Sequence, residues 1–162
     1  MALPQLIEED LRVSDAALAA LVSRSEATLA LLIDRAGFLI TQAGDAAQFD
    51  TTTLAALAAG SFAASQGMAA LTREANFNSL CQQGDTSSLL ILTVDEDCLL
   101  VAVFQAGITP GAVKYYATGT VTQVAEQLKK ARVRSPGTHL DLAALNLEDT
   151  SDLFHRRKLD AN

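Results

Sequence analysis

The chain has 162 residues, of which 49% are hydrophobic and 19% are charged, and its formal net charge is −7 at pH 7. The length suits one domain with a short appendage. The negative charge argues against nucleic acid as the main partner, and so few charges on an apolar chain favour an oligomer.

The cysteines and the N-terminal residues bear on location. Cys81 and Cys98 form no CxxC pair and have no histidine nearby, which favours a reduced cytosolic protein over a disulfide-bonded one. Acidic residues occupy positions 8–10, where a signal peptide would be apolar. No uncharged run is both long and leucine-rich enough to span a bilayer. We therefore expect a soluble, cytoplasmic protein.

Residues 5–49 are predicted to form a helix and a β-hairpin. The helix covers residues 5–24, although Ser14 and Asp15 offer a fresh N-cap that would divide it. Strands at 28–33 and 38–41 flank the turn 34–37, since Asp at its first position and Gly at its last suit a tight turn. Residues 42–49 are predicted to be a loop.

The stretch from Asp50 to Leu71 is predicted to be a central helix, capped by Asp50 or Thr51 and free of charge up to Thr72. At 100° per residue it has two stripes, with Phe62, Ser65 and Gln66 between them. The first stripe is apolar and comprises Leu54, Leu57, Ala64, Met68 and Leu71. The second, which we call the small ridge, comprises Ala56, Gly60, Ala63, Gly67 and Ala70.

The small ridge calls for an explanation, because each Gly inside a helix costs about 1 kcal/mol relative to Ala. Small residues let another backbone approach closely. A second uncharged face therefore predicts a helix held between its own fold and a partner. Burial of the whole helix inside one domain is the alternative, and a membrane span is disfavoured because Ala, Ser, Thr and Gln dominate.

The second half of the chain is predicted to contain three strands and a helix. A short polar edge strand at 77–82 is followed by apolar strands at 88–94 and 98–104, which are typical of strands covered on both faces. A helix opens at Thr109-Pro110 and runs to Val133, with one ring of the pair Tyr115-Tyr116 in the core.

The elements together predict an α+β (α/β) fold with one five-stranded antiparallel sheet and helices on both faces, in the order α-β-β-α-β-β-β-α. The domain covers residues 1–133, and residues 134–162 form a C-terminal tail.

No pattern of residues predicts catalysis. The motifs of serine hydrolases, zinc proteases and phosphate-binding loops are missing, and the two histidines, His139 and His155, lie in the tail. Cys98 begins an apolar strand and is expected in the core. The acidic turn 95–97 has the residue types of a cation site, but a solvated turn is favoured. We expect no catalytic residues, no metal and no cofactor, and hence a regulatory or binding protein rather than an enzyme.

An ordered set of segments resembles a known family: LLIDRAGFLI, LAALAAGSFAASQ, QQGD, SLLILTV, CLLVAVF and ITPGAVKYYA, within residues 5–133. They resemble the Roadblock/dynein-light-chain superfamily, and within it bacterial MglB-type regulators. The resemblance implies a profilin-like sandwich and a homodimer with central helices side by side and edge strands joined. It also implies an MglA-type Ras-like GTPase as partner, whose GTP hydrolysis is accelerated by repositioning the GTPase's own residues. No arginine finger is expected, and the helix has no Arg before Arg73.

These inferences assign two sets of residues, although which face serves which role stays open. The partner-binding set is Ala56, Ala59, Gly60, Phe62, Ala63, Gln66 and Gly67. The dimer-interface set is Leu54, Leu57, Met68, Phe77 and Leu80. Two other functions remain: a non-catalytic adaptor for cytoskeletal or signalling proteins, and a small-molecule sensor, which the apolar strands disfavour.

Overall fold

The computed structural model describes residues 3–134 and contains three helices and five strands. The elements are α1 (Glu8–Ser25), β1 (Leu29–Asp34), β2 (Leu39–Gly44), α2 (Thr51–Leu71), β3 (Ser79–Gln83), β4 (Ser87–Thr93), β5 (Cys98–Gln105) and α3 (Pro110–Arg134). Their order is the predicted one. The predicted tail lies outside the described residues from position 135 on, as do both histidines.

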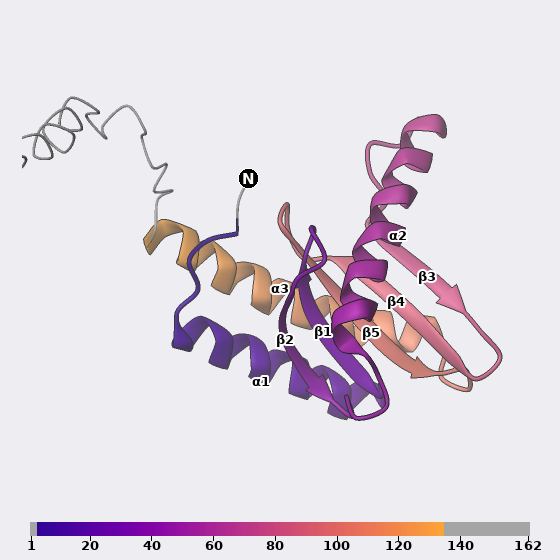
Figure 1. Cartoon of the computed structure of the whole chain (residues 1–162), viewed down its shortest axis with the longest axis horizontal. Helices are drawn as coiled ribbons and strands as arrows, with labels where there is room; N and C mark the ends of the chain where they lie inside the picture. The colour runs from indigo at the N-terminus through magenta and orange to yellow at the C-terminus, as the bar shows by residue number, and fades with distance from the viewer. Residues whose placement is uncertain (1–2, 135–162) are drawn as a thin grey trace, which may run out of the picture.

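The five strands form one antiparallel sheet in the order β2-β1-β5-β4-β3. Helices α1 and α3 cover one face and α2 covers the other (Figure 1). The central strands β1 and β5 bury side chains in both layers: Leu32 and Leu100 face α1 and α3, whereas Leu31 and Val101 face α2. This double burial explains why these strands show no polar alternation, and it confirms the predicted fold class.

The hairpin turn 34–37 forms as predicted. The Asp34 carboxylate accepts a hydrogen bond from the Phe38 N–H (2.8 Å), and Gly37 has φ +94°, which favours glycine. A Cβ at Gly37 would lie 2.8 Å from the Ala56 Cα, so the turn fits closely against α2. Strand β2 extends to Gly44, three residues beyond its predicted end, because residues 41–44 all pair with β1.

Helix α1 is continuous, so the predicted alternative of a break at Ser14 is wrong. The Ser14 hydroxyl donates to the Asp10 carbonyl (2.9 Å) inside the helix instead of capping a new one. The first turn is closed by the Asp10 carboxylate, which accepts from the Ile7 N–H (2.9 Å). The helix therefore begins at Glu8, three residues later than predicted.

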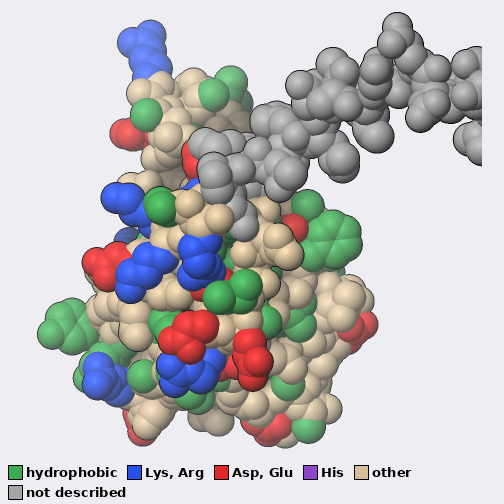
Figure 2. All heavy atoms as spheres, turned by 90° about the vertical axis from the view of Figure 1, so that its left-hand side faces the viewer, with side chains coloured by type: hydrophobic (Ala, Val, Ile, Leu, Met, Phe, Trp, Pro, Cys, Tyr) green, Lys and Arg blue, Asp and Glu red, His purple; other side chains and the backbone are tan. Residues whose placement is uncertain are grey.

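Asp10 also joins α1 to α3. Its side chain is 2% exposed and accepts hydrogen bonds from Gln127 Nε2 (2.7 Å) and from the guanidinium of Arg134. Burial alone would raise the pKa of Asp10, but the hydrogen bonds from Arg134, Ile7 and Gln127 outweigh it, so the pKa lies below its usual 3.8. Figure 2 views the end of the molecule where α1 begins and α3 ends, and basic and acidic side chains alternate there.

Helix α3 differs from the prediction at its tyrosines. Tyr115 and Tyr116 are both exposed and meet edge to face, with their ring centroids 5.3 Å apart. The core face of α3 passes instead through Val113, Ala117 and Thr120, so the expectation of one buried ring is wrong. Both tyrosines lie between two core positions of the 3.6-residue repeat.

Candidate functional site: the outer surface of helix α2

Helix α2 begins at a well-formed cap. The Asp50 carboxylate accepts from the Thr53 N–H (3.1 Å) and from the Thr53 hydroxyl (2.6 Å), as the predicted N-cap requires. These two hydrogen bonds lower the pKa of Asp50. The helix ends at Leu71, and Arg73 takes a left-handed conformation (φ +62°) just beyond it. The charge-free stretch is thus one helix of 21 residues.

The core face of α2 belongs to neither predicted stripe. It lies between them and packs on β1, β4 and β5. Its buried members are Ala55, Ala58, Ala59, Phe62, Ser65 and Ala69. Phe62 is only 1% exposed, so neither it nor the buried Ala59 is available as an anchor for another chain, contrary to the partner-binding set. The core position of Phe62 follows from its size, because it is the only large residue on a face of small ones.

Both predicted stripes lie at the surface. Every residue of the small ridge is exposed, and added Cβ atoms at Gly60 and Gly67 would meet nothing within 4 Å. On the other stripe Leu57, Met68 and Leu71 are 65%, 53% and 85% exposed, and Leu54 is half-buried. The glycines therefore fill no tight space within the described chain. Helix α2 presents an uncharged surface that its own fold leaves uncovered.

The arrangement of α2 explains this exposure. It lies alone on its face of the sheet, and its last turns extend past the strands (Figure 1). Among the described helices, α2 is the one whose length and composition would allow a membrane span, but 33% of its apolar segment is buried inside the chain. A helix that packs partly on its own sheet can have this length and composition without entering a membrane.

Gln66 and β3 shape one end of this surface. The Gln66 side chain donates to the Phe77 carbonyl (2.9 Å) and accepts from the Phe77 N–H (3.2 Å), so it holds the segment that leads into β3. Phe77 and Leu80 are half-buried. Strand β3 starts at Ser79, pairs with β4 alone and forms the predicted polar edge of the sheet. It is the edge strand nearest the end of α2 in sequence.

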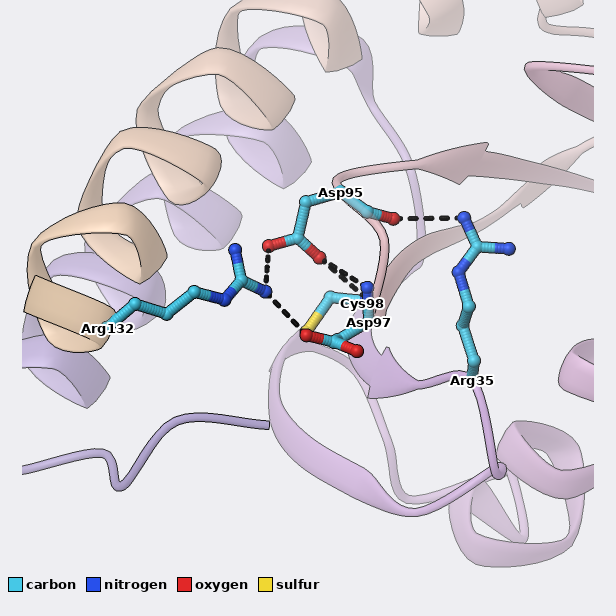
Figure 3. Close-up of polar contacts among 5 residues, drawn as sticks. All are labelled: Arg35, Asp95, Asp97, Cys98 and Arg132. Carbon is cyan, nitrogen blue, oxygen red and sulfur yellow. Dashed lines mark hydrogen bonds and ion pairs between the residues drawn. The ribbon is translucent and has the colours of Figure 1, made fainter. Parts of the chain in front are cut away.

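The acidic turn between β4 and β5 is not simply solvated, contrary to the prediction. The Asp95 carboxylate accepts from the backbone N–H groups of Asp97 (2.9 Å) and Cys98 (2.8 Å). Arg132 of α3 pairs with both Asp95 (2.8 Å) and Asp97 (2.7 Å), as Figure 3 shows. Burial, together with Asp95 and Asp97, raises the pKa of Cys98 to about 12, so this core thiol stays protonated.

Comparison with known families and structures identifies the fold family. Residues 14–104, more than half of the chain, match the model of the Roadblock/LC7 domain. The chain belongs to the Roadblock/LC7 family. A comparison with curated proteins gave no match.

The chain is similar to several solved MglB structures. MglB of Myxococcus xanthus has 28% identity, a TM-score of 0.73 and coverage of 78% of this chain and 96% of that one. The gliding protein MglB of Thermus thermophilus has 29% identity with the same TM-score and coverage. A structure described as MglB with a tetrameric arrangement has 29% identity, a TM-score of 0.74 and coverage of 79% and 96%. The predicted resemblance is therefore confirmed for family and fold.

Proposed function

We propose that this Roadblock/LC7 protein is a dimeric, cytoplasmic regulator of a Ras-like small GTPase of the MglA type, which it stimulates to hydrolyse GTP. The observation that carries the proposal is the uncovered, charge-free outer surface of α2. An apolar surface of this extent on a small domain marks a protein interface. The likeness to MglB over 96% of the MglB chains supports a regulator of that class.

The two stripes of α2 suggest a division of roles. The leucine stripe carries the large exposed side chains Leu57, Met68 and Leu71, which suit the dimer interface together with Phe77, Leu80 and the open edge of β3. A structure described as MglB with a tetrameric arrangement is consistent with association between copies. The small ridge, centred on Gly60, Ala63 and Gly67, then remains for the GTPase, because it permits close backbone approach.

The protein would stimulate GTP hydrolysis by positioning the catalytic residues of the GTPase. No arginine precedes Arg73 in α2, and Arg73 lies past the end of the helix. The guanidinium of Arg35, beneath α2, already donates to the Asp95 carbonyl (2.9 Å). We therefore propose that the protein supplies no arginine finger and no catalytic group of its own. It would bind the GTPase and hold the GTPase's own catalytic residues in place.

The test places Arg at the small ridge. Ala63→Arg adds a long side chain whose charge the contact must desolvate, so we expect binding of the GTPase to be lost while the dimer and the fold persist. Ala20→Arg is the matched control, since Ala20 is exposed on α1 across the sheet. Single-turnover GTP hydrolysis by a Ras-like GTPase from the same genome and sedimentation of each variant give the readouts.

The outcomes separate the alternatives. Binding without faster hydrolysis would favour a non-catalytic adaptor. A monomeric Ala63→Arg variant would place the ridge on the dimer axis. Unaltered stimulation by Ala63→Arg would refute the assignment of the ridge to the GTPase.

A further inference from the structure

Arg35 is fixed in place next to α2 by contacts with two elements, the turn between β4 and β5 and α2 itself. It lies in the β1–β2 turn, and its N–H donates to the Asp97 carbonyl (2.9 Å). Its guanidinium donates to the Asp95 carbonyl (2.9 Å), as Figure 3 shows. The guanidinium also lies 5.6 Å from the ring centroid of the buried Phe62. An aromatic ring on one side and a carbonyl on another restrict the rotamers of the guanidinium. Arg35 is exposed but preorganised.

The charge of Arg35 has no acidic partner in the part of the chain that the structure describes. Its only side-chain hydrogen bond there goes to a neutral carbonyl. The acids of the neighbouring turn, Asp95 and Asp97, pair instead with Arg132 from the other layer of the sheet. A guanidinium has five N–H donors in a planar fork that matches a carboxylate, so Arg35 retains donors for an incoming anion.

Arg35 lines a groove of about 380 Å³ beside α2. The walls include the amide side chains of Gln66, Asn76 and Asn78. The acidic turn contributes Glu96 and also Asp95, whose carboxylate is paired with Arg132. The groove is next to the small ridge through Gln66, and the turn that carries Arg35 contacts the ridge separately. Gln66 lies between Ala63 (i−3) and Ala70 (i+4) on the same side of the helix, and Gly37 of the Arg35 turn lies against Ala56.

We propose that this groove receives an acidic side chain of the protein that docks on the small ridge, and that Arg35 is its ion-pair partner. The inference rests on the proposed function, because it takes the GTPase as that protein. The carboxylate would meet a fixed guanidinium, with the amides of Asn76 and Asn78 beside it as further donors. The contact would be a single ion pair between opposite charges, since Arg35 is the one basic residue among the described residues that line the groove.

Glu96 allows a test of whether the group that enters the groove is acidic or basic. It is exposed, and its side chain has no hydrogen bond among the described contacts, so it opposes an incoming carboxylate rather than anchoring a ligand. Arg35→Gln and Glu96→Gln therefore shift the binding of an acidic group in opposite directions. The reverse pair of shifts would identify a basic group in the groove.

The experiment measures the affinity of each variant for the GTPase loaded with a non-hydrolysable GTP analogue, at low and high salt. We expect Arg35→Gln to weaken binding roughly tenfold and to reduce its salt dependence, and Glu96→Gln to strengthen it. Equal affinity of Arg35→Gln and wild type, or weakening by Glu96→Gln, would overturn the inference and leave the proposed function standing. A wild-type protein that binds no GTPase would refute both.

A second variant covers the case in which Arg35→Gln loses its fold. Arg35→Lys keeps the charge and carries an amine, which a carbodiimide couples to a nearby carboxylate. We expect an amide cross-link between position 35 and an Asp or Glu of the bound GTPase, found by mass spectrometry. Cross-links that join the new amine at position 35 only to Glu96 of the same chain would contradict the proposal.

Discussion

Replacing both ridge glycines by alanine should make the protein more stable and a worse partner. Gly inside a helix is less favourable than Ala by about 1 kcal/mol. The methyl groups of Gly60→Ala and Gly67→Ala would meet nothing within 4 Å among residues 3–134, so no clash there offsets this difference. The sites are two helical turns apart, and their effects should add to about 2 kcal/mol. At an interface with close backbone approach, the same methyl groups overpack and cost about 1–3 kcal/mol of binding.

Urea denaturation at several protein concentrations gives the stability of the fold, because a dimer makes the midpoint depend on concentration. Calorimetry with the GTPase gives the affinity. Gly119→Ala is the matched control: Gly119 lies in the interior of α3, and its added Cβ also meets nothing within 4 Å. We expect it to gain about 1 kcal/mol of stability with no change in affinity. A double ridge variant that loses stability would show that the ridge packs within the fold. A stabilised variant with unchanged affinity would show that the ridge contacts no partner.

Two further predictions concern the interior. Asp10→Ala removes a buried carboxylate and leaves Gln127 and Arg134 without their acceptor, so we expect a loss of about 3 kcal/mol in urea denaturation. The folded pKa of Asp10 lies below the usual 3.8, so its contribution to the free energy of unfolding should be complete above pH 3.8 and fall as the pH drops through the lowered pKa. If Asp10→Ala lost stability in acid in the same way as the wild type, this reasoning would be wrong. For the thiols, a chromogenic disulfide reagent at pH 8 should modify exposed Cys81 quickly and buried Cys98, whose pKa is about 12, only after unfolding. Equal rates for the two thiols would refute the assignment.

Local patterns were sufficient to predict most of the fold. The turn 34–37 was recognisable because Asp34 and Gly37 act within four residues of each other. The doubly covered strands were recognisable from their unbroken apolar runs, which need helices on both faces. The break expected at Ser14 was wrong because a serine hydroxyl bonds equally well to the carbonyl four residues back, inside a helix.

Long-range contacts were not predictable from such patterns. Asp95 and Asp97 looked like a solvated turn, because their partner Arg132 is 37 and 35 residues away in the sequence. The fixed position of the Arg35 guanidinium was not predicted from the sequence, for a similar reason. Its turn position gives no hint of the carbonyl 60 residues away that holds its guanidinium. A sequence signal for Arg35 would have required knowing first that the two turns lie at the same end of the sheet.

The face of α2 that packs on the sheet was missed for a different physical reason. Periodicity identifies a core face only when the opposite face is polar, and α2 carries no charge anywhere on its circumference. Its core contact is made by Phe62 with alanines and one serine around it, so the largest exposed side chains, such as Leu57 and Leu71, lie elsewhere. A helix that had only to hold its own sheet would gain solubility from Lys or Glu at those positions. The absence of such charges on α2, together with two glycines that its own packing does not need, is explained if other chains cover both exposed stripes.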